Sequence, residues 1–136
     1  MAVKVKATQL AAVKKELMEK QNYRCPLTGR DLRRITPANV CVDHCHTSGF
    51  IRAALPRGVN GAEGKIKAIL GRYVGIAGDD VPAQAKFLHA LADYLMLHRV
   101  PQTNYIHPKH LSPAEQREKR NATARKRYAA KKRAGG

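Results

Sequence analysis

The chain has 136 residues, with 26 Lys and Arg against 10 Asp and Glu, which gives a formal net charge of +16. This length is enough for one compact domain with an appendage and too short for two ordinary domains. No segment approaches the roughly 20 consecutive apolar residues of a membrane span, which argues against an integral membrane protein. The strong positive charge predicts a polyanionic partner, and nucleic acid is the first candidate.

The apolar residues are enough for a core, but the core must be aliphatic. Hydrophobic residues make up 43% of the chain, with no Trp, five Tyr and two Phe. The first six residues include two lysines where a secretory signal needs an apolar stretch, so we expect a cytoplasmic protein. Three cysteines without an export signal argue against a disulfide framework.

The first predicted element is a helix with Leu10, Val13 and Leu17 on one face, which runs to about Lys20. The residues from Cys25 to Gly29 are typical of a turn.

Two short strands follow, at residues 40–42 and 50–55. The turn residues Thr47, Ser48 and Gly49 between them predict a β-hairpin. The fold class we expect is therefore α+β, with a hairpin and a helix embedded among other helices.

Further helices are predicted from Val59 to Leu70 and from about Asp80, where Pro82 lies in the first turn. The later helix places four apolar residues on one stripe: Leu88, Leu91, Ala92 and Leu95. Three glycines between the two helices act as breakers: Gly71, Gly75 and Gly78.

The C-terminal segment differs in composition from the rest of the chain. Leu111 is the last aliphatic residue larger than Ala, and the preceding segment is rich in proline and histidine. We therefore divide the chain into a domain of residues 1–108 and a basic tail of residues 109–136. Residues 112–136 of this tail contain nine Lys and Arg residues: Arg117, Lys119, Arg120, Arg125, Lys126, Arg127, Lys131, Lys132 and Arg133.

The tail begins with a helix-start signal, because Ser112 and Glu115 have the spacing of a capping box. No apolar face follows apart from Tyr128, so this segment cannot pack on a core. Two interpretations stay open: a solvated, partly disordered tail, or a helix that phosphates order when DNA binds.

The chemistry of the chain is concentrated at the predicted hairpin. Asp43, His44 and His46 lie near its turn, and Asn60 opens the next predicted helix. Asp43 and Asn60 offer hard oxygen ligands that suit Mg²⁺ or Mn²⁺ with water and phosphate completing the shell. An imidazole such as that of His44 can take a proton from water near neutral pH. An isolated Asp–His pair is more often structural, but this cluster together with the charge indicates phosphodiester hydrolysis.

The residues from Gln21 to about Leu97 resemble the recombination endonuclease VII family of phages, a branch of the ββα-metal (His-Me finger, HNH-like) nucleases. The resemblance rests on four segments in the expected order. These are Gln21 to Pro26, Val42 to Gly49, then Ile51 and Arg52 with Asn60, Glu63 and Gly64, and finally Ala92 to Leu95.

The resemblance implies that Asp43 and Asn60 bind the divalent metal and that His44 is the general base. It further implies that His46 holds or polarises the scissile phosphate. Glu63, one helical turn after Asn60, is a weaker candidate for the outer shell of the metal. We expect Arg52 and the nine basic residues of the tail to contact DNA.

The sequence departs from the family at its structural zinc site. Family members have two Cys-x-x-Cys pairs, whereas here only Cys25 is retained, and the other positions are Thr28, Pro56 and Val59. One thiolate cannot form a structural zinc site, so we expect none. A site made of Cys25, Cys41 and Cys45 with a histidine would place zinc in the active centre. We expect Val59 and Leu27 to replace the metal by apolar packing, with Cys41 as an ordinary small buried residue.

The resulting prediction is a metal-dependent DNA endonuclease of a phage, acting in the cytoplasm of the host cell. The resemblance suggests a homodimer that cuts branched DNA such as four-way junctions. One alternative is a site-preferring HNH nicking endonuclease. The other is a non-catalytic DNA-binding or packaging protein on the same scaffold, which would have no need to retain Asp43, His44, His46 and Asn60.

Overall fold

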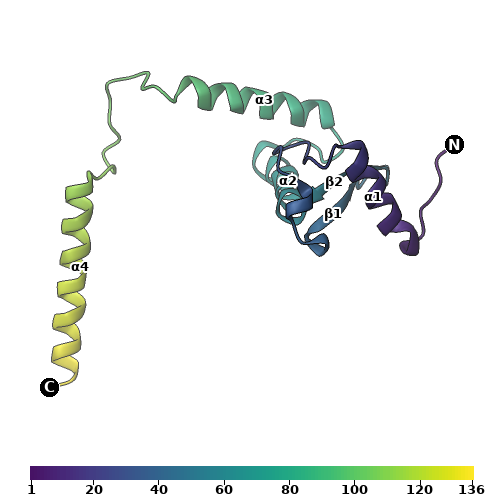
Figure 1. The fold of residues 1–136 in the computed structure, drawn as a ribbon. Coiled ribbons are helices and arrows are strands. Elements are labelled where there is room, and N and C mark those ends of the chain that lie inside the picture. Colours follow the sequence, from purple (N-terminus) through teal and green to yellow (C-terminus); the bar gives the residue numbers. More distant parts are fainter. The chain divides into compact units, whose positions relative to one another are not determined.

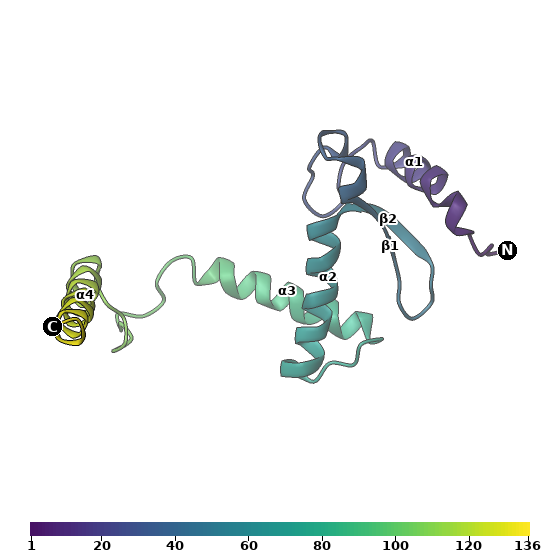
Figure 2. The same cartoon turned by 90° about the horizontal axis from the view of Figure 1, so that it is seen from below.

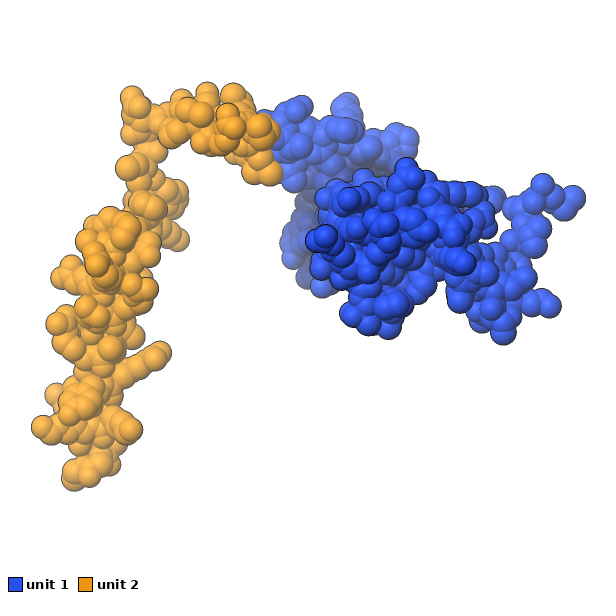
Figure 3. All heavy atoms as spheres, in the orientation of Figure 1, with its two compact units in different colours: residues 1–93 blue, residues 94–136 orange.

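The computed structural model describes residues 1–136 and has the expected α+β composition, with four α-helices and one two-stranded antiparallel sheet (Figure 1). The chain forms two compact units, residues 1–93 and residues 94–136, shown in different colours in Figure 3. The boundary between these units lies at residue 93, whereas we predict the boundary between the catalytic domain and the basic tail at residue 108, and that division stays a prediction.

The first helix and the turn after it agree with the sequence prediction. Helix α1 spans Leu10–Lys20. Asn22 and Tyr23 then adopt left-handed backbone conformations, with φ of 50° and 58°, and reverse the chain. The predicted turn closes with a hydrogen bond of 2.8 Å from the Gly29 amide to the Cys25 carbonyl.

The predicted hairpin is confirmed. Strand β1 spans Val40–His44 and pairs antiparallel with β2, Ile51–Pro56. Asp43 is opposite Ala53, but His44 is opposite Ile51, so β2 contains one extra residue, Arg52. This β-bulge interrupts the alternation of side chains between the two faces of the hairpin.

Helix α2 spans Arg57–Ile69 and begins directly after the hairpin, two residues before the predicted start. A π-helical turn continues it from Leu70 to Val74, and Gly75, with φ of 75°, ends it. Glycine has no Cβ and adopts this left-handed conformation readily, so Gly75 is confirmed as a breaker, whereas Gly71 lies inside the π-helical turn. Figure 2 shows α1 and α2 on either side of the hairpin, and both helices contact it.

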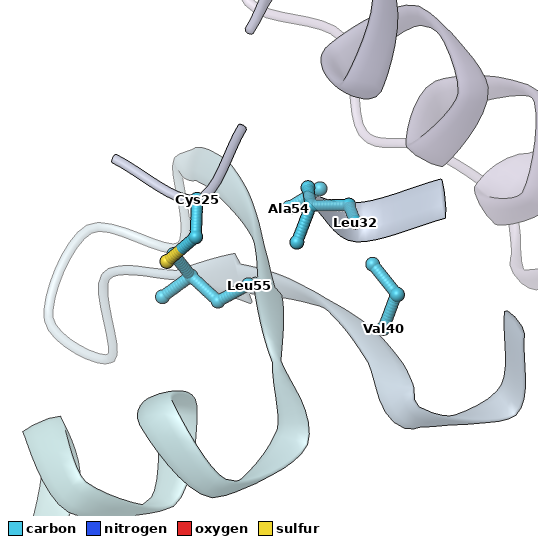
Figure 4. Packing of buried hydrophobic residues seen from close by; sticks show 5 residues of the cluster. All are labelled: Cys25, Leu32, Val40, Ala54 and Leu55. Atoms are coloured by element: carbon cyan, nitrogen blue, oxygen red, sulfur yellow. The ribbon is translucent and has the colours of Figure 1, made fainter. Parts of the chain in front are cut away.

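The core of residues 1–93 is small and aliphatic, as predicted. Its buried cluster joins the turn, the hairpin and the segment between them, and consists of Cys25, Leu32, Val40, Ala54 and Leu55 (Figure 4). Val59 packs against this cluster, as expected. The expectation for Leu27 was wrong: its side chain is 64% exposed, because it lies at the outer side of the turn. Cys41 is only half-buried.

Helix α3 spans Val81–Leu97. Its start agrees with the prediction, because the Asp80 carboxylate accepts a hydrogen bond of 3.1 Å from the Ala83 amide. Gln84 is the buried residue of this helix, and its amide donates to the carbonyls of Ala77 and Gly78 at 3.0 Å. The leucines of the predicted stripe, in contrast, are exposed.

The tail forms one helix, α4, which spans Pro113–Ala134. The predicted capping box is present: the Ser112 hydroxyl accepts from the Glu115 amide at 3.3 Å, and the Glu115 carboxylate accepts from the Ser112 amide at 2.7 Å. None of its residues is buried. No helix in the structure combines the length and apolar character that crossing a membrane requires.

Candidate active site

The hairpin positions the predicted catalytic side chains at its loop end, where His44 is opposite Ile51. Asp43 and His44 are the last two residues of β1, and the loop after them closes with two backbone hydrogen bonds. The Cys45 amide donates to the Phe50 carbonyl at 2.9 Å, and the Gly49 amide donates to the Cys45 carbonyl at 2.7 Å. The loop brings His46 back against His44, so that the two imidazoles stack with 4.8 Å between ring centroids.

Asp43 is a buried carboxylate with a single charged partner. Only 6% of the residue is exposed, and Arg52 donates to both of its oxygens. The distances are 2.7 Å from Nε to Oδ2 and 2.9 Å from Nη2 to Oδ1. This pairing raises the pKa of the Arg52 guanidinium. The bulge explains the contact, because regular alternation would turn Arg52 away from the face on which Asp43 lies.

Helix α2 places Asn60 and Glu63 one turn apart, as the sequence spacing predicts. The Glu63 carboxylate lies 3.2 Å from Arg52 Nη2 and 3.6 Å from Lys67 Nζ. Because α2 packs against both strands, the structure brings together three of the predicted residues, Asp43, Arg52 and Glu63, in one ion-pair network.

Two contacts of this network were not predicted from the sequence: that of Lys67 with Glu63 and that of Arg52 with Asp43. The i, i+4 spacing of Glu63 and Lys67 was a signal for the first of these contacts. Nothing in the sequence indicated the contact of Arg52 with Asp43, because the residue pattern does not show where a β-bulge occurs. The predicted contact between Arg52 and DNA stays a prediction, as do the roles of His44, His46 and Asn60.

Cys45 lies in the loop between the two histidines. Hydrogen bonding with the Ser48 hydroxyl, and with the backbone amides of Ser48 and Thr47, lowers the pKa of its thiol to about 7. No three His, Cys, Asp or Glu side chains gather closely enough in the structure to hold a metal ion among themselves. A cation at Asp43 and Asn60 would therefore need water or substrate oxygens to complete its shell.

The basic residues of the tail lie on a helix that is polar on all sides. An open groove along α4 is lined in part by Lys119, Arg120 and Arg127. The two acidic residues, Glu115 and Glu118, lie in the first two turns, whereas the last turn is basic. This order favours the helix, because it compensates the partial charges at both helix ends.

A sequence model of the family described as recombination endonuclease VII matches residues 2–96, which is well over half of the chain. The chain belongs to the recombination endonuclease VII family. The chain is therefore an endonuclease by family, and the family implies DNA as its substrate. The match includes the whole hairpin, α2 and nearly all of α3, and it ends before α4. A search of curated proteins found no match.

Proposed function

We propose that this chain is a Mg²⁺- or Mn²⁺-dependent endodeoxyribonuclease that hydrolyses phosphodiester bonds in branched DNA such as four-way junctions. The strongest support is the packing of α2 against β1 in a member of the endonuclease VII family. Asp43 and His44 end the strand, and α2, which provides Asn60, packs against it.

The donor set fits a small divalent cation. Asp43 offers a carboxylate oxygen and Asn60 an amide oxygen, and both are hard ligands of the type that Mg²⁺ prefers. At this site a divalent metal would stabilise negative charge on the scissile phosphate and on the leaving oxygen. Asp43 and Asn60 would hold it, and no structural zinc is part of the proposal.

The two histidines have separate proposed roles. His44 accepts the proton of the attacking water, and general bases of this kind contribute about 10²–10⁴-fold to a rate. His46 stacks on His44 and donates to the scissile phosphate, so that the ring pair orients the base and the phosphate together. Arg52 and the basic residues of α4 contact the DNA backbone.

We also propose that the enzyme acts as a homodimer in the cytoplasm of the phage host. The support for the dimer is the stripe on α3, where Leu88, Leu91 and Leu95 are 39%, 40% and 61% exposed. Burying a leucine side chain contributes about 1.5–3 kcal/mol, which favours covering this stripe with a second copy. Sedimentation of the full chain and of Leu91→Asp tests this: a dimer that the substitution dissociates supports the proposal.

The central experiment compares nicking of a linear duplex and of a four-way junction, side by side, with and without Mg²⁺. Cleavage that requires the metal and favours the junction supports the whole proposal. Equal cleavage of both substrates favours a site-preferring HNH nicking enzyme. Tight DNA binding without cleavage in Mg²⁺ or Mn²⁺ would favour a non-catalytic DNA-binding or packaging protein.

A further inference from the structure

Arg52 holds both carboxylate oxygens of Asp43 in a bidentate contact. Contacts of this geometry between charged groups are among the strongest polar interactions in proteins. The Asp43 side chain is only 8% exposed, so little water competes for its oxygens. Asp43, the candidate metal ligand, is thus already paired with the positively charged guanidinium of Arg52.

The same guanidinium has a second carboxylate within reach. Arg52 Nη2 lies 3.2 Å from Glu63 Oε1, and Lys67 also lies near this oxygen. The two carboxylates and the two basic side chains balance to zero net charge. A divalent cation on Asp43 would stand beside the guanidinium and be repelled by it. Arg52 can relieve this repulsion by moving away from Asp43. It would still keep an ion pair, because its guanidinium already contacts Glu63.

We propose that Arg52 and the divalent cation compete for Asp43. Arg52 keeps the buried carboxylate paired in the metal-free enzyme and moves to Glu63 when the cation binds. This inference rests on the proposed function, because it takes Asp43 as a metal ligand. It assigns Glu63 a positioning role, the reception of the guanidinium, in place of a role in the outer shell of the metal.

The test measures binding of Mn²⁺ alone to the full chain without DNA, by electron paramagnetic resonance of the free ion. Arg52→Gln removes the competing charge, so the Mn²⁺ affinity should rise about tenfold or more. Arg57→Gln is the matched control, because Arg57 donates to the Ala38 carbonyl and not to Asp43. An unchanged or weaker affinity in Arg52→Gln overturns the proposal, since Arg52 would then orient Asp43 for the metal.

A double-mutant cycle tests the role of Glu63. Glu63→Gln should lower the Mn²⁺ affinity in the native background, because Arg52 then keeps Asp43 as its only carboxylate partner. The same substitution in the Arg52→Gln background should have little effect. An equal loss in both backgrounds overturns the transfer to Glu63 and favours the outer-shell role.

Two further variants separate this inference from folding defects and from the proposed function. Arg52→Gln leaves a buried carboxylate unpaired and lowers fold stability. Arg52→Lys keeps the positive charge but cannot make the bidentate contact with a carboxylate. Its Mn²⁺ affinity should therefore lie between those of the native chain and Arg52→Gln. Native-like binding by Asp43→Asn overturns the metal assignment together with this inference. Weak binding by Asp43→Asn, with no gain in Arg52→Gln, overturns this inference alone.

Discussion

The side chain of Gln21 pairs with the backbone of Ala54 at two points, as a neighbouring strand would. Its Oε1 accepts from the Ala54 amide at 2.7 Å, and its Nε2 donates to the Ala54 carbonyl at 2.9 Å. Gln21 directly follows α1, and Ala54 is a fully buried residue of β2. This pair therefore fixes the end of α1 to the strand that contains Arg52.

Removing this amide should destabilise the fold. Gln21→Ala leaves the buried backbone groups of Ala54 without a partner, which costs about 1–3 kcal/mol in the free energy of unfolding. Gln21→Glu should be at least as costly, because a carboxylate cannot donate to the Ala54 carbonyl. Urea unfolding measures both variants. Gln102→Ala removes an exposed amide and should change stability by less than about 0.5 kcal/mol. Native-like stability of both Gln21 variants would contradict the prediction.

His44→Ala should lower the rate of cleavage by about 10²–10⁴-fold while DNA binding persists, because a general base acts only in the chemical step. Asp43→Ala should abolish cleavage altogether, through loss of the metal. Single-turnover cleavage and fluorescence anisotropy measure the two properties separately, with His107→Ala as the control. Near-normal cleavage by both active-site variants would remove the support for this site.

The purified protein should contain no stoichiometric zinc and should keep its fold in a chelator that abolishes cleavage. The reason is that Pro56 and Val59, at two of the family's cysteine positions, are respectively buried and packed on the core. Elemental analysis and circular dichroism before and after chelation check this. About one tightly held zinc per chain, with unfolding on its removal, would show that the core depends on metal.

Asp31 should make stability depend on pH in the acid range. Hydrogen bonds from the Arg33 side chain and amide lower the pKa of this carboxyl to about 2 in the folded chain. Its unfolded pKa is about 3.9, so the stabilising contribution is complete above that pH and is lost as the pH falls towards 2. Asp31→Asn should therefore be less stable than the native chain at pH 7 and equally stable near pH 2. Urea midpoints across this range measure the difference, and a constant difference would contradict it.

Cutting the chain after Leu111 should leave residues 1–93 folded, because no residue of their core lies in the removed segment. DNA binding should weaken at all sequences. If about five of the nine basic residues contact phosphates, the slope of log affinity against log salt should fall by about 0.9 per lost contact. Cleavage at saturating DNA should persist. An unchanged slope, or a truncated chain that fails to fold, would count against a DNA-binding tail.

Local signals made the hairpin and the ends of the helices predictable. Thr47 to Gly49 are turn residues between two apolar runs, and Ser112 with Glu115 is a complete helix-start signal within four residues. These patterns place Asp43 and His44 at the end of a strand without knowledge of the rest of the fold. Every part of that inference depends on residues close to one another in the chain.

Contacts between distant segments could not be predicted in this way. Gln21 and Ala54 are 33 residues apart, and any other polar side chain near the end of α1 would look equally suitable in the sequence. Leu27 is apolar but points outward, because its place in a five-residue turn decides its exposure. Arg52 reaches Asp43 only because β2 has one residue more than regular pairing allows.

The bulge at Arg52 and the loop before it should tolerate insertions and deletions very differently. Residues added near Ser48 lengthen a loop that lies beyond the last strand pair, so the register of the hairpin is unchanged. A residue added or removed between Ile51 and Ala53 changes the bulge itself, and a one-residue slip turns the following side chains to the other face. Over evolutionary time, related chains should therefore vary in length before Ile51 and keep a fixed spacing from Arg52 to Asn60.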